Sequence, residues 1–223
     1  MQNLTNFMQS YFNGLILRPP LFYSSEFGLR FEISMPGEEH INKENLKQIK
    51  ERTTSLFDHV FHDSDDILLI TDVNTVEEDR FLEKRPTKVY QKYIRHKDTL
   101  YKLQYKLLPW VFQHVDDEED DNMVTHRFIL PCQKRDIRYQ QLLMAISYED
   151  FTHPTQLLKG FQHAGLEIYF VNVTRKIIYH LYDDRGCDII ASDKEDIRSL
   201  YNDRNDWILD YDRQRIENMM NAQ

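Results

Sequence analysis

Apolar residues recur every three or four positions in several stretches of the chain, which is the spacing of an amphipathic helix. The clearest stretch is residues 43–62, where apolar side chains fall on one face and charged side chains on the other. Residues 2–13 show the same spacing, and Asn13-Gly14 is typical of a helix C-terminus. A third helix is predicted from Asp136, a suitable N-cap, to about Phe151.

Alternation of apolar and polar residues, or short apolar runs, predicts strands elsewhere in the chain. The stretches that show this before residue 135 are 29–34, 66–73, 99–108 and 124–132. The pattern of residues 99–108 also allows a helix. Residues 166–192 carry the strongest strand pattern. They predict three consecutive antiparallel strands, which turn near residues 172–176 and again at the sequence DDRG.

The chain is predicted to become helical again from about residue 193. Ser192 or Asp193 is expected to cap the first turn, and Glu195 follows Ser192 at the spacing of a capping box. Trp207 and Tyr211 lie four positions apart. We therefore expect them to share a helical face and to anchor the C-terminal helix to the sheet.

Helices and strands mix without the regular alternation of a doubly wound fold, and the strands favour hairpins. We predict a single α+β domain over residues 1–223, with an antiparallel or mixed sheet packed by amphipathic helices and a helical C-terminus. Residues 74–88 are polar and are expected to form a surface segment. The acidic surface loop 116–122 separates two strand candidates, so we expect a long hairpin with a charged tip.

Composition and charge narrow the possible functions. The chain has 223 residues and a formal net charge of −9, which disfavours binding to nucleic acid or to an anionic membrane. Its apolar runs are far shorter than the roughly 20 residues that span a bilayer, and its N-terminus lacks the pattern of a secretion signal. We expect a cytoplasmic protein in which Cys132 and Cys187 are reduced thiols.

The sequence contains none of the common motifs for cofactors or metals. P-loop, GxGxxG, HExxH, GxSxG and CxxC patterns are missing, and six glycines leave little material for a phosphate-binding loop, so we expect no cofactor. His59 and His62, three positions apart, are an alternative metal pair. They are expected to face solvent near a helix C-terminus, which itself favours histidine, so no metal site is predicted.

The stretch YDDRGCDIIA, residues 182–191, has two interpretations. In the first, DDRG is a type I turn in which Gly186 takes a left-handed conformation and Asp183 accepts hydrogen bonds from backbone amides. In the second, it is the active site of a hydrolase-like enzyme. Asp183, Asp184 and Asp188 would serve as acid, base or metal ligands. Arg185 would bind an anion. Cys187 would be a nucleophile, with His180 as its base.

The segment LRFEIS with the helix that ends in LFDHVFHDSDDILLI, and the later segment IIYHLYDDRGCDIIASDKEDIRSLYNDRNDWILDYDRQRI, resemble a bacterial family catalogued as domain of unknown function 3885. The resemblance covers most of the chain and is strongest from Ile168 to Ile216. It implies a small cytoplasmic bacterial protein. It carries no activity and no catalytic residues that could be transferred to this chain.

Two functions from different classes remain. The first is a non-catalytic module that binds a basic protein partner, such as an immunity protein that inhibits a basic toxin domain, because charge complementarity raises association rates. The residues expected to bind are Asp116, Asp117, Glu118, Glu119, Asp120, Asp121, Asp184 and Arg185. The second is the enzyme that uses the DDRGCD turn. The binding function is preferred.

Overall fold

Seven antiparallel strands form one sheet within the described part of the chain. The computed structural model describes residues 4–37, 42–78, 82, 86–112, 122–149, 151, 157 and 165–222. The strands are β1 (Phe27–Glu32), β2 (Asp66–Val76), β3 (Gln104–Pro109), β4 (Met123–Gln133), β5 (Gly165–Asn172), β6 (Ile177–Leu181) and β7 (Gly186–Ala191). Their order is β1-β7-β6-β5-β2-β4-β3. This arrangement confirms the predicted α+β fold class.

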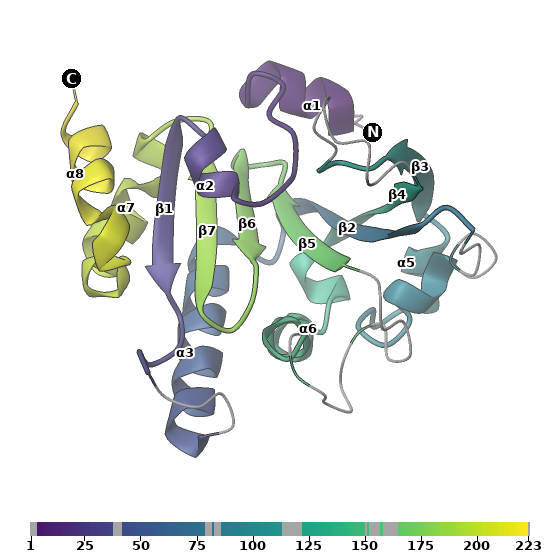
Figure 1. Cartoon of the computed structure of the whole chain (residues 1–223), viewed down its shortest axis with the longest axis horizontal. Coiled ribbons are helices and arrows are strands. Elements are labelled where there is room, and N and C mark those ends of the chain that lie inside the picture. The colour runs from purple at the N-terminus through teal and green to yellow at the C-terminus, as the bar shows by residue number, and fades with distance from the viewer. Residues whose placement is uncertain are drawn as a thin grey trace.

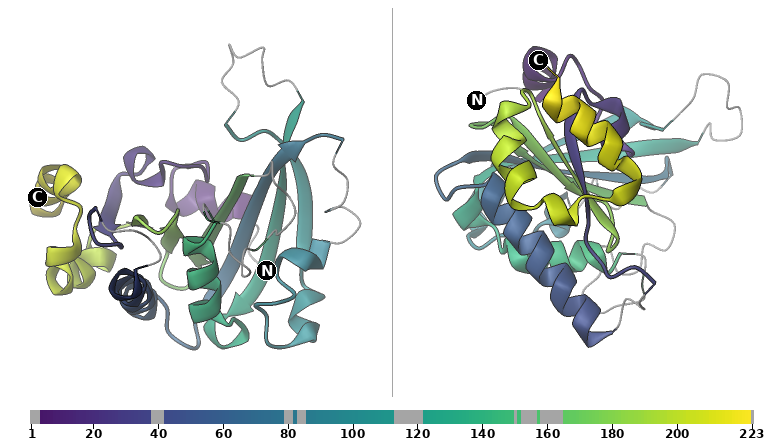
Figure 2. Two further views of the ribbon diagram at one scale, coloured as in Figure 1. Left: turned by 60° about the horizontal axis from the view of Figure 1, so that its bottom comes forward. Right: turned by 90° about the vertical axis from the view of Figure 1, so that its left-hand side faces the viewer.

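Helices cover both faces of the sheet (Figure 1). They are α1 (Leu4–Tyr11), α2 (Leu21–Ser24), α3 (Lys43–Val60), α5 (Lys97–Leu100), α6 (Tyr139–Ser147), α7 (Glu195–Asp203) and α8 (Arg213–Asn221). Helices α3 and α6 lie behind the sheet in the view of Figure 1, and α1 and α2 lie in front of it. Helices α7 and α8 follow the β1 edge, and the right-hand view of Figure 2 shows α3 running along one side of the strands.

The two faces carry separate hydrophobic cores. We call the side that packs on α3, α6, α7 and α8 the helical face and the side that packs on α1 and α2 the N-terminal face. The helical face is the larger core, with Phe57 of α3 at its centre, stacked on Tyr139 at 4.8 Å and set edge-on against Phe170 at 5.0 Å. Burying each large side chain of this kind contributes about 1.5–3 kcal/mol.

Helix α3 follows the predicted pattern closely. Asn42 caps it by accepting a hydrogen bond from the amide of Glu44 at 2.9 Å, and Ile49, Leu56 and Phe57 are fully buried. The helix ends at Val60, two residues before the predicted end, and Phe61 then turns into the core. None of the helices in the described residues combines the length and the apolar character needed to cross a membrane.

The hairpins form at the positions that the sequence predicts. Strands β5, β6 and β7 form the predicted antiparallel meander, and β3 pairs with β4 as the predicted long hairpin. The acidic loop 116–122 at its tip lies outside the described residues except for Asn122. The predicted surface segment 74–88 is partly wrong, because Asn74–Val76 extend β2 and Asn74 is buried.

Three predicted elements differ from the structure. The strand over 99–108 exists only from Gln104, because Lys97–Leu100 form the short helix α5. Helix α6 begins at Tyr139, and Asp136 instead accepts a hydrogen bond from the amide of Gln133 in a preceding 3-10 turn. Its predicted extension to about Phe151 is also too long, because the helix ends at Ser147.

The C-terminal segment is helical but interrupted. Asp193 lies two residues before α7 and accepts a hydrogen bond from the amide of Glu195, the first residue of the helix, at 2.9 Å. Two 3-10 turns, Asn205–Trp207 and Asp210–Asp212, separate α7 from α8. The predicted pairing of Trp207 and Tyr211 on one helical face is therefore wrong, and Tyr211 is 85% exposed.

Candidate functional site

The DDRG turn is held together by Asp183. One carboxylate oxygen of Asp183 accepts hydrogen bonds from the amides of Arg185 at 2.7 Å and Gly186 at 3.3 Å. The other oxygen binds the Arg185 guanidinium. The predicted capping of the turn by Asp183 is confirmed. The charge of Asp183 is neutralised within the turn, although the Arg185 side chain remains 74% exposed.

Gly186 is required for a reason that differs from the predicted one. Among the described glycines, Gly14 and Gly37 have positive φ, whereas Gly186 does not, so its predicted left-handed conformation is wrong. Gly186 begins β7 opposite Glu32 of β1. A Cβ atom at this position would overlap the phenol of Tyr182, which lies across the glycine. Close side-chain approach therefore excludes larger residues here.

Cys187 and His180 lie on opposite faces of the sheet. In the β6–β7 register His180 stands opposite Asp188, and Cys187 stands opposite Leu181. Cys187 is fully buried on the helical face, where burial raises the pKa of its thiol well above the usual value. The structure therefore does not bring the nucleophile and base of the enzyme hypothesis together.

Arg30 and Asp188 form a buried ion pair on the N-terminal face. The Arg30 Nε and Nη2 atoms donate to the two Asp188 carboxylate oxygens at 2.7 and 2.9 Å. Asp188 also accepts a hydrogen bond from the backbone amide of Phe22, at the start of α2, at 3.0 Å. Burial acts to lower the pKa of Arg30, but Asp188 outweighs it and the net pKa is raised. Strand β1, strand β7 and α2 are thus joined by one charged pair.

Aromatic rings surround this ion pair. The Arg30 guanidinium lies over the rings of Tyr23 at 4.7 Å and Tyr182 at 5.3 Å. The Tyr23 hydroxyl donates to Asp212 at 2.8 Å, and Asp212 is 3.9 Å from Arg30 Nη1. Asp188, the predicted acid or ligand, is therefore already occupied by a structural partner.

The charged pairs continue across the sheet as a polar belt, which we define as Arg30, Asp188, His180, Glu167, Asp72 and Arg127. His180 Nε2 and Glu167 lie 2.8 Å apart, and Arg127 donates to Asp72 at 2.7 and 2.5 Å. Burial raises the pKa of Asp72, and Arg127 opposes that rise. The belt separates the apolar patch under α1 from the end of the sheet that holds the DDRG turn.

Two buried polar atoms of this region have no hydrogen-bond partner among the described residues. They are the Tyr169 hydroxyl and His180 Nδ1. The two rings stack with their centroids 4.5 Å apart, and both residues are fully buried. Buried polar atoms of this kind commonly form a hydrogen bond with an ordered water molecule.

The alternative metal pair is not assembled. His59 contacts Ser199 Oγ at 3.0 Å, whereas His62 is exposed and follows the end of α3. Burial lowers the pKa of His59. In the part of the chain that the structure describes, no three His, Cys, Asp or Glu side chains come together as metal ligands.

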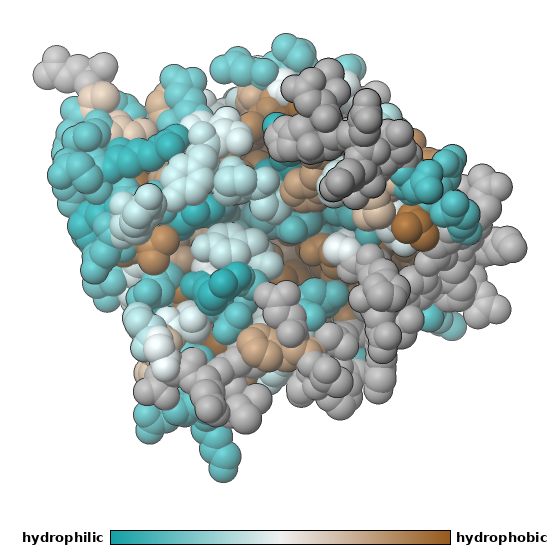
Figure 3. Space-filling view, in the orientation of Figure 1, coloured by the Kyte–Doolittle hydropathy of each residue, from teal (hydrophilic) through white to brown (hydrophobic). Residues whose placement is uncertain are grey.

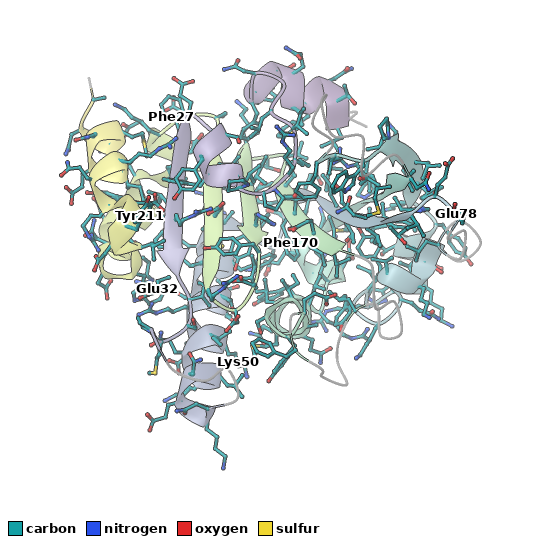
Figure 4. All side chains as sticks on the ribbon, viewed as in Figure 1. Phe27, Glu32, Lys50, Glu78, Phe170 and Tyr211 are labelled. Atoms are coloured by element: carbon teal, nitrogen blue, oxygen red, sulfur yellow. The ribbon has the colours of Figure 1, made fainter. Side chains whose placement is uncertain are left out.

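The same ends of several strands carry carboxylates, which are spread across the molecule: Figure 4 labels Glu32 toward the left and Glu78 at the right edge. The register aligns the end of β1, the β6–β7 turn, and the end of β2 with the start of β4. We call Glu32, Glu77, Glu78, Asp183 and Asp184 the acidic end. The Glu77 amide donates to the carbonyl of Asn122, so the acidic run 116–121 adjoins this end in sequence. Arg185, Arg18 and Arg52 also lie here, bound to Asp183 and to backbone carbonyls.

The opposite end of the sheet has the reverse balance. Lys134 and Arg135 follow β4, and Arg175 and Lys176 form the β5–β6 turn. These cations stand beside Asp65, Asp66 and Asp136. The strands therefore run between an acidic end and an end of mixed charge.

Comparison with known proteins decides the family. The family model described as Domain of unknown function (DUF3885) matches residues 4–212. The chain belongs to this family. It is also 31% identical over 215 residues to the uncharacterized protein YnaE of Bacillus subtilis (strain 168), covering 94% of this chain and 98% of that protein. No solved structure matches the chain.

The two segments on which the DUF3885 resemblance rests meet at β1. The amide of Ile33 donates to the carbonyl of Arg185 at 2.8 Å, and the amide of Leu209 donates to the carbonyl of Arg30 at 3.0 Å. Phe31 forms an isolated antiparallel bridge with Ile208. The edge of β1 that would otherwise be open is thus covered by the segment NDWILDYDR.

Sequence reasoning missed Arg30, Asp212, Asp72 and Arg127 as parts of this region. A signal was present for one of them, because Asp72, like Asp188, interrupts an apolar strand that is buried on both sides. A charge in such a strand requires a partner of opposite charge. The partner cannot be named without the register between strands that are distant in sequence.

Proposed function

We propose that this DUF3885 protein is a non-catalytic, cytoplasmic module that holds a basic protein partner, and that it acts as an immunity-type inhibitor of a basic toxin domain. The observation that carries the proposal is the acidic end of the sheet, where the same ends of several strands carry carboxylates that are spread across the molecule. Complementary charge of this kind speeds the encounter with a basic partner and suppresses wrong partners.

The net charge of −9 supports the same function. Residues 116–121 add six carboxylates that adjoin the acidic end in sequence, and we propose that they take part in binding together with Asp184 and Arg185. Figure 2 shows β2, β3 and β4 extending beyond the helices, and this supports the proposal because the helices leave this part of the sheet uncovered.

The enzyme hypothesis has less support from the geometry. Asp183 is bound to Arg185 and to the turn, Asp188 is bound to Arg30 and Phe22, and Cys187 is buried on the other face from His180. Each of these groups is committed to a structural contact that catalysis would have to break.

Calorimetric titration tests the proposal, with the full chain and the purified protein encoded by the adjacent gene. We expect a one-to-one complex that weakens as salt is raised, because exposed charges are screened over about 10 Å at 0.1 M salt. A variant with residues 116–121 neutralised, together with Glu77→Gln and Glu78→Gln, should bind more weakly.

A control variant neutralises Asp196 and Asp206, which are exposed near the C-terminal helices, and should bind as the unmodified chain does. Absence of binding at low salt, or equal weakening by both variants, would refute the proposal.

A further inference from the structure

The N-terminal face of the sheet carries a second apolar surface beyond the polar belt, where β2 ends and β4 begins. Val76 pairs with Met123, and Leu108 pairs with Thr125, so these side chains lie beside one another on the same face as Ile70. Val76 is 45% exposed, and Leu108 and Met123 are half-buried. Figure 3 shows hydrophobic side chains on this face toward the right, where β2 ends.

The segment after β3 brings two aromatic residues to this surface. The Val111 amide donates to Thr125 Oγ1 at 3.1 Å, and the Val111 carbonyl accepts a hydrogen bond from Arg18 at 3.3 Å, so the chain turns over the N-terminal face here. Trp110 and Phe112 flank Val111, their rings lie 5.8 Å apart, and both are half-buried. We define the hairpin patch as Val76, Leu108, Trp110, Phe112 and Met123.

The chain around the hairpin patch is acidic. Residues 74–78 and 107–126 contain eight carboxylates, which are Glu77, Glu78 and the six of the run 116–121, and no lysine or arginine. Glu77 and Glu78 follow Val76 directly and are exposed. The cations Arg18 and Lys106 lie on the side toward the polar belt, where Arg18 binds the Val111 carbonyl and Lys106 pairs with Arg127 across β3 and β4. An apolar, aromatic centre with a charged rim is typical of a protein–protein interface.

Trp110 is the residue of the hairpin patch best suited to anchor a partner. Tryptophan dominates the binding energy of many interfaces, because its ring offers a large apolar area together with an N–H donor. The Trp110 Nε1 atom is buried and has no hydrogen-bond acceptor among the described residues. A buried donor of this kind is unfavourable, so an acceptor supplied by a bound protein would stabilise the complex.

We infer that the hairpin patch is the contact surface for the basic protein partner, with Trp110 as its central anchor. The partner presents an apolar pocket ringed by lysines or arginines, which bury the centre of the patch and pair with its acidic rim. A second copy of this chain fits less well, because two acidic rims would face each other. The inference rests on the proposed function, which supplies the basic partner.

Fluorine NMR of the full chain, labelled with 5-fluorotryptophan, tests the inference when the purified protein encoded by the adjacent gene is added. The chain has two tryptophans, and Trp207→Phe assigns their signals. The Trp110 signal should shift saturably, because contact with the partner changes its surroundings. The Trp207 signal should stay in place, because its ring contacts Arg52 and Arg204 near the C-terminal helices, away from the hairpin patch.

Calorimetric titration with the same partner measures how much the hairpin patch contributes to affinity. Trp110→Ala should weaken the complex by at least about tenfold. The salt dependence should match that of the unmodified chain, because the variant keeps every charge. Tyr211→Ala is the matched control, since Tyr211 is 85% exposed and Figure 4 labels it on the side of the molecule opposite Glu78. It should bind within about twofold of the unmodified chain.

The fluorine measurement keeps the native ring, so it decides the case even if Trp110→Ala does not fold. A complex in which the Trp110 signal stays in place, or in which Trp110→Ala and Tyr211→Ala bind alike, would overturn the inference and leave the proposed function standing. If no complex forms at low salt, both fail. A Trp110 signal that shifts with the concentration of this chain alone would assign the hairpin patch to a second copy and refute the inference.

Discussion

Arg30 and Asp188 face each other across the β1–β7 pair, and two hydrogen bonds of 2.7 and 2.9 Å join their side chains. The Asp188 side chain is fully buried and that of Arg30 is 11% exposed. Removing one member of such a pair leaves an uncompensated buried charge, which costs more than the pair itself contributes. This relationship gives the first prediction.

Arg30→Met should lower the free energy of unfolding by about 3–5 kcal/mol, because Asp188 then stays buried and unpaired. Asp188→Asn keeps an oxygen for the Phe22 amide but leaves Arg30 unpaired. The double variant should lose less than the sum of the two single variants. Urea denaturation of all four proteins measures the coupling, and additive losses would show that the two side chains do not act as a pair.

Gly186→Ala should destabilise the fold by about 1–3 kcal/mol, because the new methyl group displaces the Tyr182 ring. In a Tyr182→Ala background the same substitution should be nearly neutral, since the overlapping phenol is gone. Thermal and urea unfolding of the two pairs of proteins measure the cost of Gly186→Ala in each background. An equal cost of Gly186→Ala in both backgrounds would indicate backbone strain instead.

Neither cysteine should react with a thiol reagent in the folded protein. Burial raises the pKa of Cys132 to about 12 and that of Cys187 well above its ordinary value, so almost no thiolate exists at neutral pH. Both thiols should react at once in urea. Ellman titration with and without denaturant measures this, and rapid labelling of one thiol in native buffer would contradict it.

Stability should fall as the pH rises above about 10. Burial is the main cause that raises the pKa of Tyr93 and of Tyr139 to about 12, whereas tyrosines of the unfolded chain ionise near pH 10. Between these values the folded state holds more protons than the unfolded state, so each rise in pH favours unfolding. Urea midpoints across this interval, with tyrosinate absorbance in parallel, measure the effect. A constant midpoint would be inconsistent with buried tyrosines.

The predicted elements agree best with the structure where the local pattern and the tertiary environment favour the same element. Residues 43–62 and the meander 166–192 fold as predicted because their apolar periodicity matches the faces they bury. Lys97–Leu100 and the segment 205–212 differ from the prediction, and in the second segment pairing with β1 outweighs the periodicity. The bridge from Phe31 to Ile208 breaks the C-terminal helix, and no local signal marks it.

The polar belt and the acidic end follow from strand order, which local patterns do not give. Arg30 and Asp188 lie far apart in sequence and become neighbours only because β1 is added beside β7. By contrast, the Asp183 turn involves residues within three positions, and its chemistry was readable from the sequence. The capping of a turn by a neighbouring side chain is therefore predictable from one sequence, whereas cross-strand charge pairs require the topology.

The pairing of β1 with β7 also determines when the sheet can form during synthesis of the chain. Phe27 pairs with Ala191, so β1 leaves the ribosome long before its partner is synthesised. At the usual rates of translation the delay is on the order of ten seconds. During that time Leu29, Phe31 and the charge of Arg30 have no sheet to join. Completion of the sheet therefore waits for the last third of the chain.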